Sequence, residues 1–184
     1  MNSTQRTGLH GLGLAAAIAA LAGCSALGFP DTTPTARVEL QSRSGSSTSG
    51  TATLTQDAKQ VVVRYEITGL KPNGEHGFHV HEKGDCSAAD GTSAGGHFNP
   101  AGKPHGPYGM TESHAGDMPN LRADASGVAR GSFTLEGFTV GGGGPADVLG
   151  RSMVVHRDPD DYKSQPAGNS GPRIACGLIV AVKR

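Results

Sequence analysis

The sequence predicts an all-β domain of short antiparallel strands that form a barrel or sandwich. Glycine is abundant, with 29 residues in a chain of 184, while tryptophan is absent and aromatic residues are few. The runs rich in Val, Ile, Leu and Thr are short and are bounded by turn signals. No segment has the periodicity of a convincing amphipathic helix, and the length suits one domain with a sizeable core.

The N-terminal segment is expected to be a targeting signal. Its apolar run, Leu12 to Leu21, is shorter than the roughly 20 residues that a membrane-spanning helix needs. It ends in Leu-Ala-Gly-Cys, which resembles a bacterial lipobox with lipid on Cys24; an ordinary secretory signal that contains a cysteine is the alternative. The predicted division is a signal peptide of the lipoprotein type (1–23), a flexible tether (24–35) and the folded domain (36–184).

Cysteine usage agrees with export from the cytoplasm. The chain has three cysteines, and an odd count in an exported protein needs an explanation. If Cys24 carries lipid, Cys86 and Cys176 remain as one pair in an oxidising compartment. Such a bridge would contribute about 4–5 kcal/mol in the chain-entropy picture. Two free buried thiols are the alternative.

The first half of the domain contains four expected strands. Residues 37–42 form the first, and a Ser/Gly turn leads to the Thr-rich second strand at 51–56. An Asp-Ala-Lys turn precedes the third strand, 60–68, which is the longest β-branched run. A loop with a Pro-Asn-Gly signal then leads to the strand that carries His79 and His81.

The second half contains four more strands and two long loops. The strands are expected at 120–124, 128–135, 151–156 and 173–182. Residues 82–119 lack strand periodicity, and a structureless loop of that length would normally count against the assignment. This loop holds Cys86 and four candidate metal ligands, however, so a metal and a disulfide can order it. The second loop spans 157–172.

The strand that begins at Gly77 places two imidazoles on one face. Side chains alternate along a strand, so His79 and His81 share one face while Phe78 and Val80 face the core. His76 falls on the opposite face if pairing is regular, which favours a packing or surface role for it. Two imidazoles side by side on a rigid strand are half of a four-nitrogen metal site.

The remaining candidate ligands follow in the first long loop and in one later strand. They are His97, His105, His114, Asp117 and His156. Imidazole and carboxylate without thiolate suit Cu(II) and Zn(II). Seven ligands are one short of two four-coordinate ions, so one imidazolate must bridge them, and His97 lies between the two groups in sequence. Copper would take His79, His81, His97 and His156, and structural zinc would take His97, His105, His114 and Asp117.

Six stretches together resemble the copper/zinc superoxide dismutases, in particular their bacterial exported branch. The matching stretches are Gly77–Glu82, Gly96–Pro100, Lys103–Gly106, His114–Asp117, Gly150–His156 and Gly171–Ile179. They extend over essentially the whole domain. The resemblance implies an eight-stranded Greek-key barrel with two long functional loops, one copper and one zinc per chain, and a disulfide between Cys86 and Cys176.

The resemblance also implies how the site would work. Superoxide would be dismutated to dioxygen and hydrogen peroxide by a redox-cycling copper, bridged through His97 to structural zinc. Arg173 would attract the anionic substrate, and Asp160 would link a copper histidine to a zinc histidine, with the adjacent Asp161 as the alternative. Lys163 is a weak candidate for electrostatic steering, and a solvated lysine is an equal alternative.

Composition and one departure from the family limit the partners. The formal net charge is zero, which gives no basis for nucleic acid or for a membrane contact other than an N-terminal lipid. The segment from Cys86 to His97 is longer than in the eukaryotic enzymes, so their dimer contacts are not carried over; a monomer, or a homodimer through another interface, is expected. A tolerant surface loop is the simpler interpretation of this segment. The expected location is the bacterial cell envelope or periplasm.

Two other functions fit parts of the pattern. A metal-buffering module would bind copper or zinc without turnover, but it would need no anion-binding arginine. A catalytically inactive relative would be expected to lack at least one ligand, and none is missing from the sequence.

Overall fold

The computed structural model describes residue 1, residue 33 and residues 35–182. Cys24 and nearly all of the predicted signal and tether lie outside the described residues. Within them, no helix is long and apolar enough to cross a membrane. The strands are β1 (Thr35–Ser42), β2 (Ser49–Asp57), β3 (Gln60–Thr68), β4 (Glu75–His76), β5 (Phe78–His81), β6 (Leu121–Arg122), β7 (Ala129–Glu136), β8 (Ser152–His156) and β9 (Arg173–Ala181). A single turn of 3-10 helix, η1, spans Thr92–Ala94.

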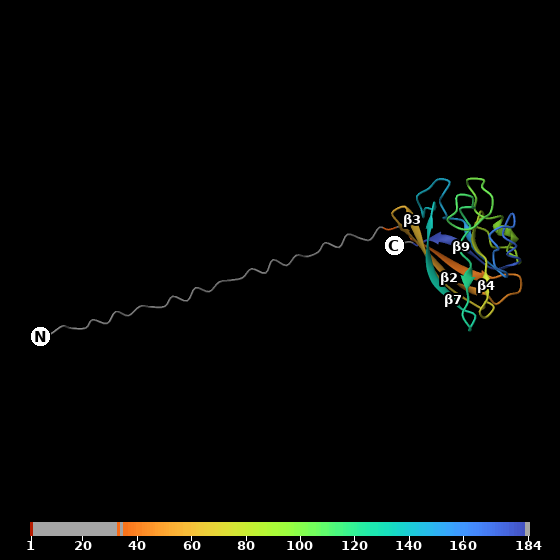
Figure 1. Ribbon diagram of the computed structural model, residues 1–184, viewed down its shortest axis with the longest axis horizontal. Helices are drawn as coiled ribbons and strands as arrows, with labels where there is room; N and C mark the ends of the chain where they lie inside the picture. The colour runs from red at the N-terminus through yellow and green to blue at the C-terminus, as the bar shows by residue number, and fades with distance from the viewer. Residues whose placement is uncertain (2–32, 34, 183–184) are drawn as a thin grey trace. The chain divides into compact units, whose positions relative to one another are not determined.

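All strand pairs are antiparallel, which confirms the predicted fold class (Figure 1). Seven strands form one curled sheet in the order β5-β8-β9-β1-β2-β3-β7, and β4 pairs with β6. Only Gly77 separates β4 from β5, so the small sheet continues from the edge of the large one. Strands distant in sequence, such as β1 and β9, lie side by side, as Greek-key connections require.

One expected strand is divided in the structure. The fourth strand becomes β4 and β5, because the backbone of Gly77 bonds to the last residue of β8 and to the chain just after it instead of continuing one ladder. Its N–H donates to the carbonyl of Asp158 at 2.9 Å, and its carbonyl accepts from the N–H of His156 at 2.8 Å. A Cβ on this residue would lie 2.9 Å from the Cβ of Ser170, so the close approach requires glycine.

At β5 and β8 the sheet has a core face and a face covered by the loops. On β5, Phe78 and Val80 are fully buried in the apolar core, as their alternation predicts. The same alternation turns His79 and His81 to the other face, where the paired strand β8 presents Val154. Every residue of β5 and β8 is buried, because both faces of these strands are covered.

The two long loops cover this second face together. Gln165 of the second loop joins them: its Oε1 accepts from the N–H of His105 at 2.8 Å, and its Nε2 donates to the carbonyl of His105 at 2.8 Å. In Figure 1 the green first loop and the blue second loop lie on the same side of the strands. Each loop is therefore held in place by hydrogen bonds to the other.

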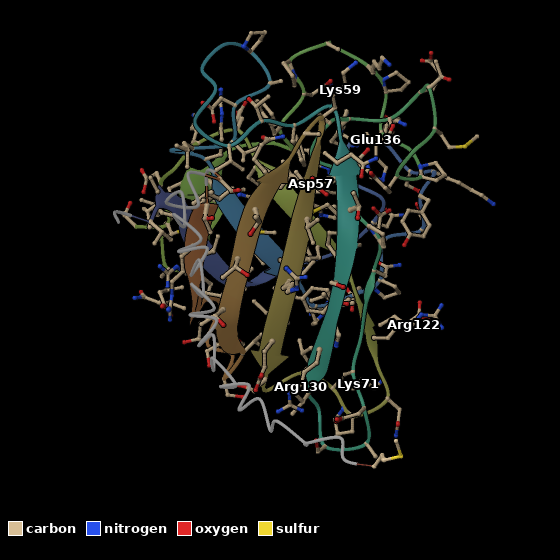
Figure 2. All side chains as sticks on the ribbon, turned by 90° about the vertical axis from the view of Figure 1, so that its left-hand side faces the viewer. Asp57, Lys59, Lys71, Arg122, Arg130 and Glu136 are labelled. Atoms are coloured by element: carbon tan, nitrogen blue, oxygen red, sulfur yellow. A yellow bond between two sulfur atoms is a disulfide. The ribbon has the colours of Figure 1, made fainter. Side chains whose placement is uncertain are left out.

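The face formed by β2, β3 and β7 carries solvent-exposed charges (Figure 2). On this face Arg130 of β7 pairs with Glu66 of β3 at 2.9 Å, and in the small sheet Arg122 of β6 pairs with Glu75 of β4 at 3.1 Å. Exposed pairs of this kind contribute little to stability. Most of the buried polar residues of the described chain, among them the candidate metal ligands and Asp160, instead lie on the loop-covered face.

Candidate metal centre

Four buried histidines meet where β5, β8 and the first loop come together. His79 and His81 come from β5, His156 ends β8, and His97 lies in the loop. None of the four is more than 7% exposed, and one nitrogen of each lies within 4.8 Å of the others. The two Nε2 atoms of His81 and His156 are 3.4 Å apart. We call these residues the tetrahistidine cluster.

Three rings of this cluster are oriented by a hydrogen bond through the nitrogen that faces away from it. His81 Nδ1 donates to the carbonyl of Gly95 at 3.0 Å, and His156 Nδ1 donates to that of Gly171 at 3.1 Å. His79 Nε2 donates to Asp160 at 2.9 Å. Since each oxygen only accepts, it sets the tautomer and leaves the opposite nitrogen with a lone pair directed at the cluster.

A second cluster forms around Asp117. Its Oδ1 lies 2.8, 3.0 and 3.2 Å from the Nδ1 atoms of His97, His105 and His114. Its Oδ2 accepts from the backbone N–H groups of Gly106 and His114, at 3.1 and 2.9 Å, which orient the carboxylate. We call His97, His105, His114 and Asp117 the histidine–aspartate cluster.

His97 belongs to both clusters. Its Nδ1 faces Asp117, whereas its Nε2 is buried and has no hydrogen-bond partner in the described part of the molecule. His79 Nδ1 is likewise buried without a partner. Buried polar atoms are nearly always satisfied, so two bare nitrogens in one cluster indicate a missing ligand. The two clusters therefore share this one imidazole.

Asp160 lies between the two clusters. Its Oδ2 accepts from His79 and its Oδ1 accepts from His105 Nε2, each at 2.9 Å. The side chain of Asn120 makes two hydrogen bonds to the backbone of Asp160. Asp160 N–H donates to Asn120 Oδ1 at 2.9 Å, and Asn120 Nδ2 donates to the Asp160 carbonyl at 3.0 Å. The carboxylate of Asp161 turns away and bonds to Ser164 and Asn169 instead.

Burial keeps the tetrahistidine cluster neutral. Desolvation holds the pKa values of His81 and His156 well below the ordinary value, and it lowers the pKa of His97 to about 4. Neutral imidazole is the form that binds metal. Burial would also lower the pKa of His105, but its bonds to Asp117 and Asp160 prevail and raise that pKa to about 9.

Arg173 reaches the rim of the tetrahistidine cluster through a bulge in β9. His156 pairs with Arg173 while the preceding Val155 pairs with Ala175, so Ile174 is the extra residue. The bulge therefore turns Arg173 towards the face of His156. Its guanidinium donates to the carbonyls of Gly91 and Gly95 at 2.7 and 2.6 Å. In the described chain it makes no ion pair with a carboxylate, the alternative role for an arginine at the start of a strand.

A disulfide joins Cys86 to Cys176, with the two Cα atoms 5.7 Å apart. It connects the first loop to β9 three residues after Arg173. Both cysteines pack with Val154 and Ala94 in a small buried group beneath the loop.

Lys163, the candidate for electrostatic steering, is exposed in the second loop.

Comparison with known proteins decides the family. Residues 48–179 match the sequence profile of the copper/zinc superoxide dismutases (SODC). The chain belongs to the copper/zinc superoxide dismutase family. It is 44% identical over 133 residues to superoxide dismutase 2 of Aquifex aeolicus, covering 71% of this chain and 78% of that protein. It is 38% identical over 173 residues to the enzyme of Deinococcus radiodurans, covering 88% and 91%.

A solved structure supports the fold assignment. The crystal structure of a SOD-like protein from Bacillus subtilis matches with a TM-score of 0.71 and 34% identity, covering 78% of this chain and 97% of that one. Homologues of this chain are named as copper/zinc superoxide dismutases, and the two clusters fit copper and zinc sites of that family. The fit is chemical as well: nitrogen donors meet in one cluster, and three nitrogens with one carboxylate oxygen meet in the other.

Several residues at this copper/zinc superoxide dismutase site were missed by the sequence interpretation. Asn120 holds Asp160, and the Gly95 carbonyl accepts from both His81 and Arg173. His76, expected to be a packing or surface residue, is buried and donates from Nδ1 to the carbonyl of His156 at 3.0 Å. These contacts join residues from 14 to 80 positions apart. No local pattern in the sequence signals them.

Proposed function

We propose that the chain dismutates superoxide in the bacterial cell envelope, with copper in the tetrahistidine cluster and zinc in the histidine–aspartate cluster. The observation that carries the proposal is the shared, buried His97, whose Nε2 is bare on one side and whose Nδ1 faces Asp117 on the other. A single imidazole whose two nitrogens face two different clusters of candidate ligands suits two metals. Packing alone does not explain it, because a buried nitrogen without a partner is costly.

The donor sets support this distribution of the metals. Four neutral nitrogens suit copper, whereas three nitrogens and a carboxylate oxygen suit a closed, structural zinc site. The bound copper would supply one-electron oxidation and reduction, so that two superoxide ions and two protons give one dioxygen and one hydrogen peroxide. We expect one ion of each metal per chain.

The protein's own groups would bind the anion and deliver a proton. Arg173 is permanently cationic and would hold superoxide at the rim of the tetrahistidine cluster. Its two carbonyl partners fix the direction of the guanidinium. His97 Nε2 would hold and release a proton for the product, while its Nδ1 stays bound within the histidine–aspartate cluster and keeps the ring in place. Asp160 would fix the orientation of the His79 and His105 rings relative to each other.

Location and assembly belong to the same proposal. Bacterial relatives, the lipobox-like ending at Cys24 and a disulfide typical of oxidising compartments support an exported protein, anchored by lipid and preceded by a signal segment. Its membrane contact would be the lipid alone. We expect a monomer, or a homodimer that does not use the eukaryotic interface.

The test is metal analysis combined with a dismutation assay on purified residues 25–184. The expected result is one copper and one zinc per chain, with dismutation that is lost when copper is removed and restored when it returns. Stoichiometric binding of both metals without turnover would contradict the proposal and favour metal buffering. Failure to bind copper would favour an inactive relative.

A further inference from the structure

A second arginine, Arg43, lies beneath the loop that orients Arg173. We define the disulfide loop as residues 86–95; it begins at Cys86 and includes both carbonyls to which Arg173 donates. Arg43 follows β1 and approaches this loop from the opposite end. Its Nε and one terminal nitrogen donate to the carbonyl of Cys86 at 2.9 and 2.5 Å, and the other terminal nitrogen donates to that of Ser42 at 2.7 Å.

The two arginines meet at Gly91. This glycine is buried and has a positive φ of 72°. A Cβ on it would lie 3.2 Å from the Cβ of Arg173 and 3.7 Å from the Cγ of Arg43. The aliphatic part of each side chain therefore packs against the same backbone, while the guanidinium groups bind different carbonyls of the disulfide loop. A shift of the loop at Arg43 is thereby transmitted to Arg173 through one short segment.

The turn that contains Arg43 also binds the start of β9. Arg43 N–H donates to the carbonyl of Ile174 at 2.8 Å, and Ser44 Oγ donates to the carbonyl of Arg173 itself at 2.8 Å. Ser44 N–H donates to the carbonyl of Ala89 in the disulfide loop, also at 2.8 Å. The turn thus holds both the backbone of Arg173 and the loop that receives its side chain.

We propose that Arg43 is a positioning residue for anion binding: it fixes the disulfide loop so that the carbonyls of Gly91 and Gly95 aim Arg173 at the substrate. The inference rests on the proposed function, because it depends on Arg173 as the group that holds the anion. Arg43 contacts no candidate metal ligand through its side-chain bonds. It reaches Arg173 through the disulfide loop, which gives two carbonyls to Arg173 and one of these, that of Gly95, also to His81.

The experiment measures azide, a small anion, binding to the copper- and zinc-loaded protein by spectroscopic titration. In Arg43→Ala we expect the azide dissociation constant to rise by about two- to ten-fold, the range for loss of one or two net hydrogen bonds. Arg43→Lys, which keeps the charge and one donor, should recover much of the affinity. Arg37→Ala is the charge-matched control, since exposed Arg37 on β1 pairs with Glu39 and makes no side-chain bond to the disulfide loop within the described residues; it should leave azide binding unchanged.

A double-mutant cycle separates positioning from a direct effect of charge. If Arg43 acts through Arg173, Arg43→Ala should add nothing in an Arg173→Ala background. Amide hydrogen exchange in the disulfide loop should quicken in Arg43→Ala and not in Arg37→Ala, a readout independent of bound copper.

Three results would overturn the inference. Azide affinity could stay unchanged in Arg43→Ala although Arg173→Ala weakens it, which would leave the proposed function intact. The two effects could add in full, which would make Arg43 a distant charge. Arg173→Ala could itself leave azide affinity unchanged, which would remove the anion role of Arg173 from the proposed function as well.

Discussion

At the scale of single residues, Arg173 separates turnover from metal storage. It donates to two backbone carbonyls and is not itself a candidate metal ligand, so its replacement should leave both metals bound. We expect Arg173→Ala to slow dismutation roughly ten-fold or more, as for loss of a charged contact to a reacting anion. Arg173→Glu should be slower still, and the wild-type rate should fall as salt rises. An unchanged rate in fully metallated Arg173→Glu would contradict the anion role.

Asp160 offers a second test at this scale, because it accepts hydrogen bonds from one histidine of each cluster. In Asp160→Asn the amide oxygen can serve only one ring, and the amide NH₂ meets the N–H of the other. We expect retention of both copper and zinc against a competing chelator to fall by about 10- to 100-fold, the usual effect of losing a partner that orients metal ligands.

The neighbouring residue supplies the matched control for Asp160. Asp161→Asn removes the same charge one position away, but within the described residues its carboxylate bonds to the second loop itself, to residues such as Ser164 and Asn169. It should therefore keep both metals. Equal losses in the two variants would mean that loop charge, and not the link between clusters, retains the metals.

At the scale of elements, the disulfide ties the first loop to β9. We expect Cys86→Ser to lower the free energy of unfolding by about 2–5 kcal/mol, measured by denaturant titration. Because the disulfide loop also receives Arg173, its amides should exchange hydrogen faster and metal retention should weaken. Wild-type protein treated with reductant should behave in the same way. Finding both thiols free in protein isolated from the envelope would show that the bridge has no role there.

Gly116 joins β5 to the segment that carries Asp117. Val80 N–H donates to its carbonyl at 3.0 Å, and its own N–H donates to the carbonyl of Phe98 at 2.8 Å. A Cβ here would lie 2.2 Å from the carbonyl oxygen of Val80, which is backbone and cannot move aside cheaply. Gly116→Ala should therefore cost about 1–3 kcal/mol of stability and weaken zinc binding by displacing Asp117.

Gly96 provides the control for this substitution. It precedes His97, yet a Cβ there would have no atom within 4 Å and its φ is not positive. Gly96→Ala should be close to neutral in thermal unfolding and in zinc content. If it proved as damaging as Gly116→Ala, the cost would come from chain stiffness and not from the contact with Val80.

The strands were predictable because their signals are local. The run at 60–68 is β3 at the predicted bounds, since β-branched residues between two turns specify a strand by themselves. The break at Gly77 was not predictable, because it depends on bonds to residues near 157 that sequence patterns do not report. Residues 120–124 shrink to the two residues of β6 for a similar reason: Asn120 is used to hold Asp160.

At the scale of the whole molecule, the candidate ligands could be predicted from the sequence, whereas the residues that hold the surrounding groups in place by hydrogen bonds could not. The chain has eight histidines, and the spacing of six of them around Asp117 predicts a metal site directly. Arg43 and Asn120 are ordinary polar residues, and only the folded chain brings them to the carbonyls that they bind. Residue type therefore predicts which side chains can bind metal, whereas the residues that orient those side chains are identified only from contacts between distant segments.

The proposed lipid anchor can be tested on the intact chain. Cys24 precedes the folded domain by more than ten residues, so Cys24→Ala should release the protein from membranes without affecting dismutation or metal content. The check is fractionation of cells that express each form, with intact-mass measurement of the membrane-extracted protein. A mature N-terminus elsewhere, without added lipid, would rule out the anchor.

The sharing of His97 has a consequence for loading. Occupancy of one cluster fixes the orientation and charge of a ring that the other cluster also needs, so the two binding equilibria are coupled. Coupling free energies are reciprocal: whatever factor zinc contributes to copper affinity, copper must contribute to zinc affinity. If the coupling is favourable, a chain with a single ion bound exchanges that ion more readily than a chain with both, and scarcity of one metal weakens retention of the other.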